Sequence, residues 1–410
     1  MDIMIDRPEY LKKLHQFKHK DLIKVVMGIR RCGKSTLFEL FQQEIMSEGV
    51  EKNQIHSINF ENIDFEELQD YRRLYQHVKE RLIPDKMNYV FLDEVQNVEN
   101  FQKAVNSLNL LKNVDLYITG SNAYLLSGEL ATLLSGRYVV INMQPLSFRE
   151  YISSFSDISD LTRKYRDYLI NSSFPYALEF HGNRDLIRDY LEGLYNTIVL
   201  KDIVARKNIA NVLMLEDVIR FMFKNIGNLV SIKKISDTMT SDGRKISTHT
   251  VESYLSALID SYILYKVGRY DIQGKQYLKS GEKYYVADIG LRYFLLGSQN
   301  VDAGHILENI VYLELIRRGY EVYIGKINNK EVDFVVQKDG YTEYYQVSQT
   351  VRSAETLDRE LSSLDAIDDH NPKYLVTMDD DLPTSYKGIK QINAIDWLLQ
   401  PDAGRKKTLR

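Results

Sequence analysis

Short apolar runs and amphipathic stretches alternate over the first 150 residues of the chain. A run of consecutive apolar residues is typical of a strand buried on both faces, whereas apolar residues three or four positions apart are typical of a helix packed on a sheet. The runs lie at residues 23–27, 56–60, 89–92, 116–119 and 138–143, with helical spacing between them, as at residues 34–46 and 65–82. This alternation predicts βαβ units and a parallel sheet covered by helices on both faces.

The rest of the chain changes pattern twice. Residues 145–227 have helical periodicity, most clearly at 186–200 and 213–223. Two helices are then expected at residues 232–239 and 248–260, followed by a hairpin of strands at 263–270 and 276–286, and this order is typical of a winged helix. From residue 301 onward, a helix at 306–318 precedes strands at 322–324, 332–336 and 344–347. This last part predicts a second α/β region.

The loop after the first strand has the pattern of a phosphate-binding loop. Residues 28–36 fit G-x-x-x-x-G-K-[ST], and they are Gly28, Ile29, Arg30, Arg31, Cys32, Gly33, Lys34, Ser35 and Thr36. The two glycines let the backbone curl so that its N–H groups point at phosphate oxygens, and the following helix adds the positive end of its dipole. Lys34 is expected to reach the β- and γ-phosphates of ATP, and the Ser35 hydroxyl to bind Mg²⁺. Arg30 and Arg31 either touch phosphate as well or are solvated.

Two carboxylates follow the third apolar run. Asp93 and Glu94 come directly after residues 89–92, at the end of a buried strand, which is where open α/β sheets place their ligands. We expect Asp93 to hold the Mg²⁺ shell and Glu94 to orient and polarise the water that attacks the phosphate. The alternative is a pair of solvated acids in a turn. The phosphate loop about sixty residues upstream favours the catalytic interpretation.

Three further side chains are candidates for the same site. Ser121 and Asn122 follow the fourth strand, where polar groups can sense the γ-phosphate, although a turn with helix-capping residues is the alternative. Arg137 follows a helical stretch at residues 123–134 and precedes the strand at 138–143. In ring-forming or dimerising ATPases an arginine there reaches the neighbouring subunit's γ-phosphate, which would make this chain a homo-oligomer. A surface salt bridge is the other interpretation of Arg137.

Composition limits the class of protein. The chain has 410 residues, a net charge of −4 and one cysteine, so a disulfide framework and a cysteine-based zinc site are excluded. It has no run of about eighteen apolar residues and no signal-peptide pattern, so we expect a cytoplasmic protein with no membrane partner. The Asn-Lys-x-Asp motif of guanine recognition is absent, which favours ATP. If Cys32 were exposed beside Lys34, its thiolate would be stabilised and its alkylation should block nucleotide binding.

Taken together, these residues resemble the prokaryotic AAA-type ATPases whose C-terminal half is a domain of unknown function called DUF4143. The resemblance covers nearly the whole chain. It implies an AAA-like core, a winged helix and a restriction-endonuclease-like C-terminal domain. The segments that carry it in the first half are residues 28–36, 92–96, 119–122, 134–137 and 145–150. Those in the second half are residues 201–203, 225–227, 283–290, 307–309 and 331–334.

The C-terminal region resembles the PD-(D/E)xK nuclease core but departs from its pattern. That chemistry needs acids to hold Mg²⁺ and a lysine to stabilise the attacking hydroxide. Glu308 lies on the first helix, and Glu331 or Asp333 supplies an acid on the next hairpin. The following strand reads Gln346-Val347-Ser348 where an acid and a lysine are required. We therefore predict no nuclease activity, unless a lysine such as Lys373 has moved into the site.

DNA is one of two partners that the middle of the chain leaves open. Residues 201–300 carry 15 Lys and Arg against 10 Asp and Glu, a balance of +5, which suits nucleic acid or a solvated helical surface. The second winged-helix helix has no Arg or Lys among its expected exposed residues, so it is a poor phosphate binder. Basic residues gather instead at Lys233, Lys234, Arg244 and Lys245. A protein partner is the alternative.

The predicted fold class is therefore α/β, with a P-loop (AAA-like) parallel sheet followed by helical, winged-helix and nuclease-like parts. We expect the ATPase core at residues 1–150, a helical lid or connector at 151–227, a winged helix at 228–296 and the nuclease-like domain at 297–410. The expected function is an ATP-driven switch or motor on an unknown partner. A DNA-binding ATPase and a slow ATP-gated protein scaffold are the alternatives.

Overall fold

The computed structural model describes residues 4–123, 136–205, 207, 209–297, 302–380 and 384–401, and the chain divides into two compact units. The first unit comprises Met1–Pro145 together with the short segments Phe174–Glu179 and Asp260–Tyr262. The second comprises Leu146–Ser173, Phe180–Ile259 and Ile263–Arg410. From residue 124 on, the helical stretch predicted at 123–134 lies outside the described residues.

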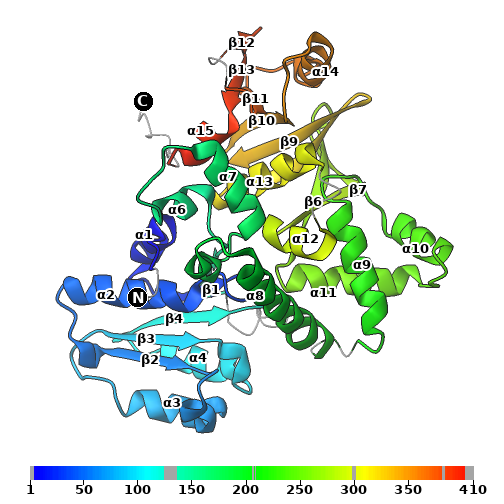
Figure 1. Cartoon of the computed structure of the whole chain (residues 1–410). Helices are drawn as coiled ribbons and strands as arrows, with labels where there is room; N and C mark the ends of the chain where they lie inside the picture. The colour runs from blue at the N-terminus through cyan, green and yellow to red at the C-terminus, as the bar shows by residue number, and fades with distance from the viewer. Residues whose placement is uncertain are drawn as a thin grey trace. The chain divides into compact units, whose positions relative to one another are not determined.

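The first unit is built on a five-stranded parallel sheet with the order β2-β3-β4-β1-β5 (Figure 1). Each of the five predicted strands is present to within two residues at either end, because the apolar runs are buried on both faces of the sheet. The strands are β1 (Ile23–Met27), β2 (Ile55–Asn59), β3 (Asn88–Asp93), β4 (Val114–Gly120) and β5 (Tyr138–Asn142).

Helices cover both faces of this sheet. On one face, the rings of Phe38 and Phe41 in α2 pack on Phe91 and Tyr117. On the other face, α3 and α4 close a separate apolar core that includes Leu74 and the alternate strand residues. The elements of this unit are α1 (Pro8–Phe17), α2 (Lys34–Ser47), α3 (Tyr71–Lys79), α4 (Phe101–Asn109) and the 3₁₀ turns η1 (Lys52–Gln54), η2 (Ile63–Gln69) and η3 (Val95–Asn97).

One helix prediction in this unit is wrong. A single helix was expected over residues 65–82, but η2 ends at Gln69 and α3 begins at Tyr71. Asp70 separates them in an extended conformation, and its side chain accepts hydrogen bonds from the backbone N–H groups of Arg72 and Arg73. Such an N-cap satisfies donors that a helix start leaves free, so the chain restarts there.

The second unit begins with helices. The predicted helices at 232–239 and 248–260 are present as α10 and α11, and the Ser247 hydroxyl caps α11 by accepting a hydrogen bond from Thr250 N at 3.0 Å. The helical elements are α6 (Phe148–Ser153), α7 (Leu161–Asn171), η5 (Pro175–Phe180, shared with the first unit), α8 (Arg184–Asn196), the π-helical η6 (Thr197–Ala205), α9 (Val212–Lys224), α10 (Ile232–Ser241), α11 (Thr248–Asp260) and α12 (Ile289–Leu296).

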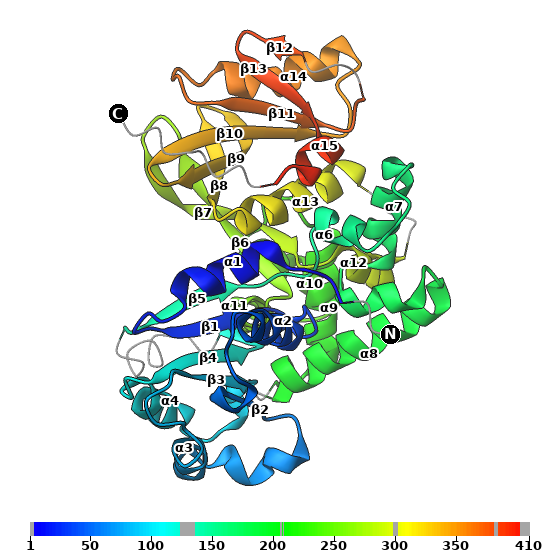
Figure 2. The same cartoon turned by 90° about the vertical axis from the view of Figure 1, so that its left-hand side faces the viewer.

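An eight-stranded mixed sheet completes the second unit, with the order β12-β13-β11-β10-β9-β8-β6-β7 (Figure 2). The predicted hairpin forms β6 and β7, but β6 also pairs with β8, so the boundary expected between residues 296 and 297 separates strands of one sheet. The elements are β6 (Leu264–Asp271), β7 (Gln276–Val286), α13 (Ala303–Arg317), β8 (Glu321–Ile327), β9 (Lys330–Lys338), β10 (Tyr341–Ser348), α14 (Ala354–Asp365), β11 (Lys373–Thr377), β12 (Ser385–Tyr386), β13 (Ile389–Asn393) and α15 (Ala394–Leu399).

Candidate nucleotide and metal site

The loop between β1 and α2 has the backbone geometry that its two glycines predict. A Cβ on Gly28 would lie 2.1 Å from the carbonyl oxygen of Met143, so only glycine fits against the backbone at this point. Gly33 has φ 102° and is the N-cap of α2, with no side chain capping the helix. A helix start without a side-chain cap leaves its N–H groups to other acceptors, which suits an anion.

Lys34 lies in the mouth of this loop and is almost fully buried. Its Nζ donates to the carbonyl oxygens of Gly28 at 3.1 Å and Ile29 at 3.4 Å, and lies 3.4 Å from Glu94 Oε1. Burial alone would lower the pKa of Lys34, but Cys32 and then the carboxylates of Glu94 and Asp93 together outweigh burial and raise it. The ammonium is therefore kept charged beside the loop.

Asp93, at the end of β3, joins the loop to the centre of the sheet. Its Oδ2 accepts from Ser35 Oγ at 2.6 Å and from Asn59 Nδ2 at 3.1 Å, and its Oδ1 accepts from the Thr119 hydroxyl. Burial raises the pKa of Asp93, and the hydrogen bonds from Ser35 and Thr119 oppose that rise. The expected pair Ser35 and Asp93 is thus brought into direct contact.

These oxygens fit a magnesium ion. A serine hydroxyl and an aspartate carboxylate in contact are hard oxygen donors, which Mg²⁺ prefers, and Mg²⁺ in nucleotide sites takes one or two such protein ligands together with phosphate oxygens and water. Asn59 and Thr119 fix the carboxylate in position.

Glu94 directly follows Asp93 and has φ 54°, a left-handed conformation that is uncommon outside glycine. Its backbone N–H donates to Thr119 Oγ1 at 2.8 Å, and its carboxylate accepts from the Gln96 amide. Burial alone would raise the pKa of Glu94, but Lys34 and then Gln96 outweigh burial and lower it. Glu94 is therefore an anionic acceptor held at a fixed angle beside the phosphate loop.

The sensor candidates differ in what can be said of them. Ser121 is buried, and its hydroxyl lies 3.3 Å from Gln96 Nε2, so it reaches the Glu94 cluster through Gln96. Asn122 is buried next to it at the end of β4. Both lie at the carboxyl edge of the sheet, on the same side as the loop.

The arginines are less closely placed. Arg30 is buried and donates to Glu61 Oε1 at 2.7 Å, whereas Arg31 is exposed with φ 65°. Arg137 is exposed and precedes β5, whose residues Tyr138 to Asn142 pair in parallel with Ile23 to Met27. A strand rises about 3.3 Å per residue, so Arg137 lies roughly 13 Å or more from this chain's own loop. Any contact of Arg137 with phosphate would have to be made in another copy of the chain.

The condition attached to Cys32 is not met. Its side chain is fully buried, and burial raises the pKa of the thiol more than Lys34 and Arg7 lower it. A buried neutral thiol is a poor nucleophile. The expectation that alkylation of Cys32 blocks nucleotide binding assumed an exposed side chain, and it therefore does not apply to this buried cysteine.

Sequence reasoning missed four supports of the site. Arg7, before α1, donates to the carbonyl oxygens of Cys32 at 3.0 Å and Gln144 at 2.7 Å and so braces the loop from behind. Thr119, Asn59 and Gln96 orient the two acids, as described above. Gln96 carried a signal, because it follows the acids by two residues, but nothing local marks Arg7, which is 25 positions from Cys32.

In the second unit, the structure brings Glu308, Glu331 and Asp333 together around Lys283, not around Lys373. Lys373 Nζ instead donates to the carbonyl oxygens of Ile367 and Asp369, each at 2.9 Å. The idea that Lys373 had moved into the acidic site is therefore wrong, and so is the premise that the site has no lysine.

Comparison with known proteins places these features in a family. An uncharacterized protein of Haemophilus influenzae is 39% identical over 401 residues, which cover 97% of this chain and 99% of that protein. The two proteins belong to one family. An uncharacterized protein of Methanocaldococcus jannaschii is 29% identical over 358 residues, covering 81% of this chain and 77% of its own length.

Two family models match parts of the chain. Residues 20–152 match the model of an AAA domain, so the first unit is an AAA-type P-loop ATPase fold. Residues 162–302 match a domain of unknown function, DUF8612, where the sequence had suggested DUF4143. The Walker-type ATPase of Pyrococcus abyssi has a similar fold, with a TM-score of 0.51 and 15% identity, covering 71% of this chain and 95% of that chain. No helix in the described part of the chain has the length and apolar character needed to cross a bilayer.

Proposed function

We propose that this protein binds Mg²⁺-ATP in the loop of residues 28–36, hydrolyses it, and uses the cycle as a switch on a partner. The observation that carries this proposal is the contact of 2.6 Å between Ser35 and Asp93, with Lys34 and Glu94 3.4 Å apart beside it. Four residues from two separate segments thus lie close together, which supports the proposal because phosphoryl transfer from a nucleotide needs a lysine, Mg²⁺ ligands and a group that positions water at one place.

Each residue has a separate task in this proposal. The loop N–H groups and the Lys34 ammonium hold the phosphates, and Ser35 and Asp93 hold Mg²⁺, which neutralises phosphate charge. Glu94 accepts a proton or hydrogen bond from the attacking water. The side-chain oxygen of Gln96 is buried without a hydrogen-bond partner among the described residues, while its amide holds Glu94. Gln96 is therefore a positioning residue that can also accept from that water.

Turnover and binding of Glu94→Gln test the proposal. We expect ATP affinity within about threefold of the natural chain and turnover lower by about 10²–10⁴-fold, because only the general base is removed. Glu51→Gln is the matched control, since Glu51 forms an exposed ion pair with Lys86, 2.6 Å away, outside the site. Full turnover by Glu94→Gln, or equal loss in Glu51→Gln, would refute the assignment.

The partner is a separate question. Adding DNA to the turnover assay distinguishes the two classes proposed for it. Stimulation that falls steeply with salt favours nucleic acid, because phosphate contacts release counterions. An unchanged rate favours a protein partner. The Glu94→Gln chain should hold that partner in the presence of ATP and release it in the presence of ADP.

A further inference from the structure

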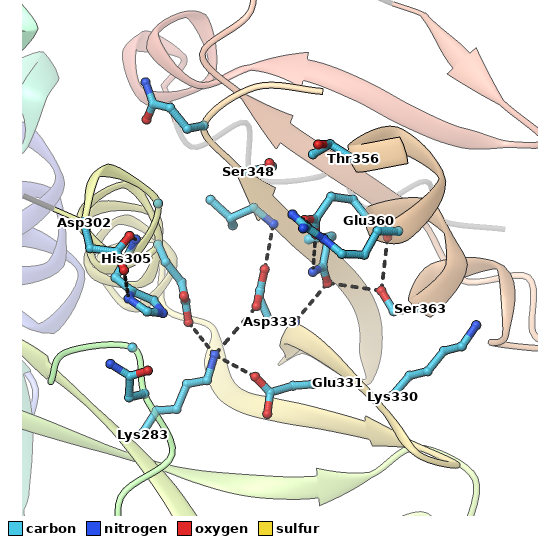
Figure 3. A pocket seen from close by; sticks show the side chains of 18 of the residues that line it. Lys283, Asp302, His305, Lys330, Glu331, Asp333, Ser348, Thr356, Glu360 and Ser363 are labelled. Carbon is cyan, nitrogen blue, oxygen red and sulfur yellow. Dashed lines mark hydrogen bonds and ion pairs between the residues drawn. The ribbon is translucent and has the colours of Figure 1, made fainter. Parts of the chain in front are cut away.

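The second unit contains a pocket of about 880 Å³ whose lining includes acidic and basic side chains from four elements, together with uncharged residues (Figure 3). Lys283 comes from β7, Glu308 from α13, Asp333 from β9 and Glu360 from α14. This pocket includes the acids that the resemblance to a nuclease predicted. Its chemistry therefore decides whether the nuclease interpretation is tenable.

Lys283 occupies the point on which three carboxylates converge. Its Nζ lies 2.8 Å from Glu308 Oε1, 2.8 Å from Glu331 Oε1 and 3.7 Å from Asp333 Oδ1. Dashed lines in Figure 3 mark its contacts with Glu331 and Asp333. Lys283 is 4% exposed, so water does not compete for the ammonium. Two carboxylates lie within hydrogen-bonding distance of the ammonium, and Asp333 lies just beyond that distance.

Side chains next to Lys283 hold its strand and the Glu308 carboxylate in position. Tyr285, two residues along β7, donates to Glu308 Oε1 at 2.6 Å, and the Asn309 side chain pairs with the backbone of Val286 at 2.8 and 3.0 Å. A Cβ on Gly227 would lie 2.7 Å from the His305 ring and 3.1 Å from Glu308 Oε2. Residues singled out separately in the sequence therefore meet around Lys283.

Other polar groups of the pocket also have protein partners. Asp333 Oδ2 accepts from Val347 N at 2.8 Å, and Gln346, which replaces the second acid of a nuclease, donates to Glu360 Oε2 at 2.8 Å. Ser348, which replaces the nuclease lysine, donates to the carbonyl oxygen of Thr350 at 3.1 Å. Each side chain at a nuclease position thus has a protein partner.

A nuclease of this fold would need Mg²⁺, and these residues do not fit that ion. A cation between Glu308 and Asp333 would lie against the Lys283 ammonium, and two cations in contact in a buried site repel strongly. Among the residues that the structure describes, no three His, Cys, Asp or Glu side chains form a group suited to a metal ion. The acids are arranged for a single-charged, hydrogen-bonding cation.

We propose that the Lys283 ammonium is the permanent cation of this pocket, that it holds β7, α13 and β9 together in place of a divalent metal, and that the pocket is not a metal-dependent nuclease centre. The natural chain then has no metal affinity here. When Lys283 loses its charge, the ammonium no longer holds the acids of Glu308, Glu331 and Asp333 apart, and these side chains can close on a divalent cation.

Calorimetric titration with Mn²⁺ of the natural chain and of Lys283→Met tests this. Lys283→Met keeps the side-chain length and removes the charge, so we expect it to bind an additional Mn²⁺ per chain. Its Tm should rise by roughly 5–10 °C on adding millimolar Mn²⁺, while that of the natural chain changes little. Any Mn²⁺ held by the phosphate loop is common to both chains and cancels in the difference.

Two controls isolate the pocket. Lys373→Met removes a lysine of the same sheet whose partners are backbone carbonyl oxygens, so it should gain no ion. Lys283→Met combined with Asp333→Asn should lose the acquired ion. If Lys283→Met does not fold alone, refolding by Mn²⁺ supports the proposal, and failure of Mn²⁺ to refold it contradicts the proposal.

Three results overturn the proposal. One is Mn²⁺ uptake by the natural chain that Asp333→Asn abolishes. Another is a folded Lys283→Met chain that gains no ion. The third is Mn²⁺-dependent DNA cleavage by the natural chain that is lost in Asp333→Ala. ATP turnover is measured on the same samples, so a failure here is distinguishable from a failure of the ATPase proposal.

Discussion

Lys34 in the first unit and Lys283 in the second are each 4% exposed and lie beside carboxylates, but the groups around them differ in kind. Lys34 contacts one carboxylate at 3.4 Å and two backbone carbonyl oxygens, at the start of a helix without a side-chain cap. Lys283 has three carboxylates within 3.7 Å. Both lysines are buried to the same extent and carry the same charge, so the number and kind of groups around each lysine decide its role.

The comparison teaches how to distinguish a binding lysine from a structural one. A lysine whose nearest partners are carbonyl oxygens and one acid can exchange these partners for an incoming phosphate. The start of the helix beside it favours the same anion. A lysine surrounded by carboxylates cannot bind a phosphate in this way, because the carboxylates that it left would be buried charges without a partner. The first arrangement suits a ligand site, and the second is an ion-pair cluster that connects β7, α13 and β9.

The largest effect that we expect is on ATP turnover, and it tests whether Arg137 completes the nucleotide site of another copy of the chain. Because Arg137 lies at the opposite end of β5 from the loop, we expect Arg137→Ala to lower turnover by up to about 10³-fold with little change in ATP affinity. Mixing Arg137→Ala with Lys34→Ala chains should restore part of the activity. Lost ATP binding in Arg137→Ala, or no rescue in a sample shown to be oligomeric, would contradict action between subunits.

Stability should separate the two lysines next. Lys283→Met leaves the buried Glu308 and the partly exposed Glu331 without their cation, beside Asp333, and we expect it to lower the free energy of unfolding by about 3–5 kcal/mol. Lys34→Ala leaves one carboxylate that still accepts from Gln96, and should cost less than about 1.5 kcal/mol. Denaturant unfolding without added metal measures both. Equal losses would remove the distinction between the sites.

The third effect is a dependence of stability on pH to which the second site contributes through Asp333. Burial, followed by the Glu308 carboxylate, raises the pKa of Asp333 to about 8 from an ordinary value of 3.8. The folded chain then binds a proton that the unfolded chain releases. Its stabilising effect is complete below about pH 4 and is lost as the pH rises toward 8, at up to about 1.4 kcal/mol per pH unit. Asp333→Asn should flatten this slope, and an unchanged slope would contradict it.

Local patterns predicted what depends on local structure. The five strands, the phosphate loop and the acids after β3 follow from apolar runs and fixed spacings, so Lys34, Ser35, Asp93 and Glu94 were predicted together. The break at Asp70 was missed, because its capping side chain competes with a pattern that otherwise continues through it.

Contacts between distant segments could not be predicted in the same way. Lys283 lies 25 positions from Glu308 and 50 from Asp333, in a strand of mixed polar and aromatic residues where a lysine gives no sign of its partners. Arg7 is equally unmarked. The pairing of β6 with β8, which joins the expected hairpin to the C-terminal sheet, has no local signal either. A sequence shows which residues can do chemistry, but which of them meet depends on the tertiary fold.

The most direct test of the central claim is equilibrium binding of ATP with Mg²⁺ to the natural chain, Lys34→Ala and Lys283→Met, each verified to be folded. We predict that Lys34→Ala weakens affinity by roughly 100-fold or more, because a charge-assisted phosphate contact is lost, while Lys283→Met binds within about twofold of the natural chain. Undiminished binding by Lys34→Ala, or an equal loss in both variants, would contradict the assignment of the nucleotide site to the loop between β1 and α2.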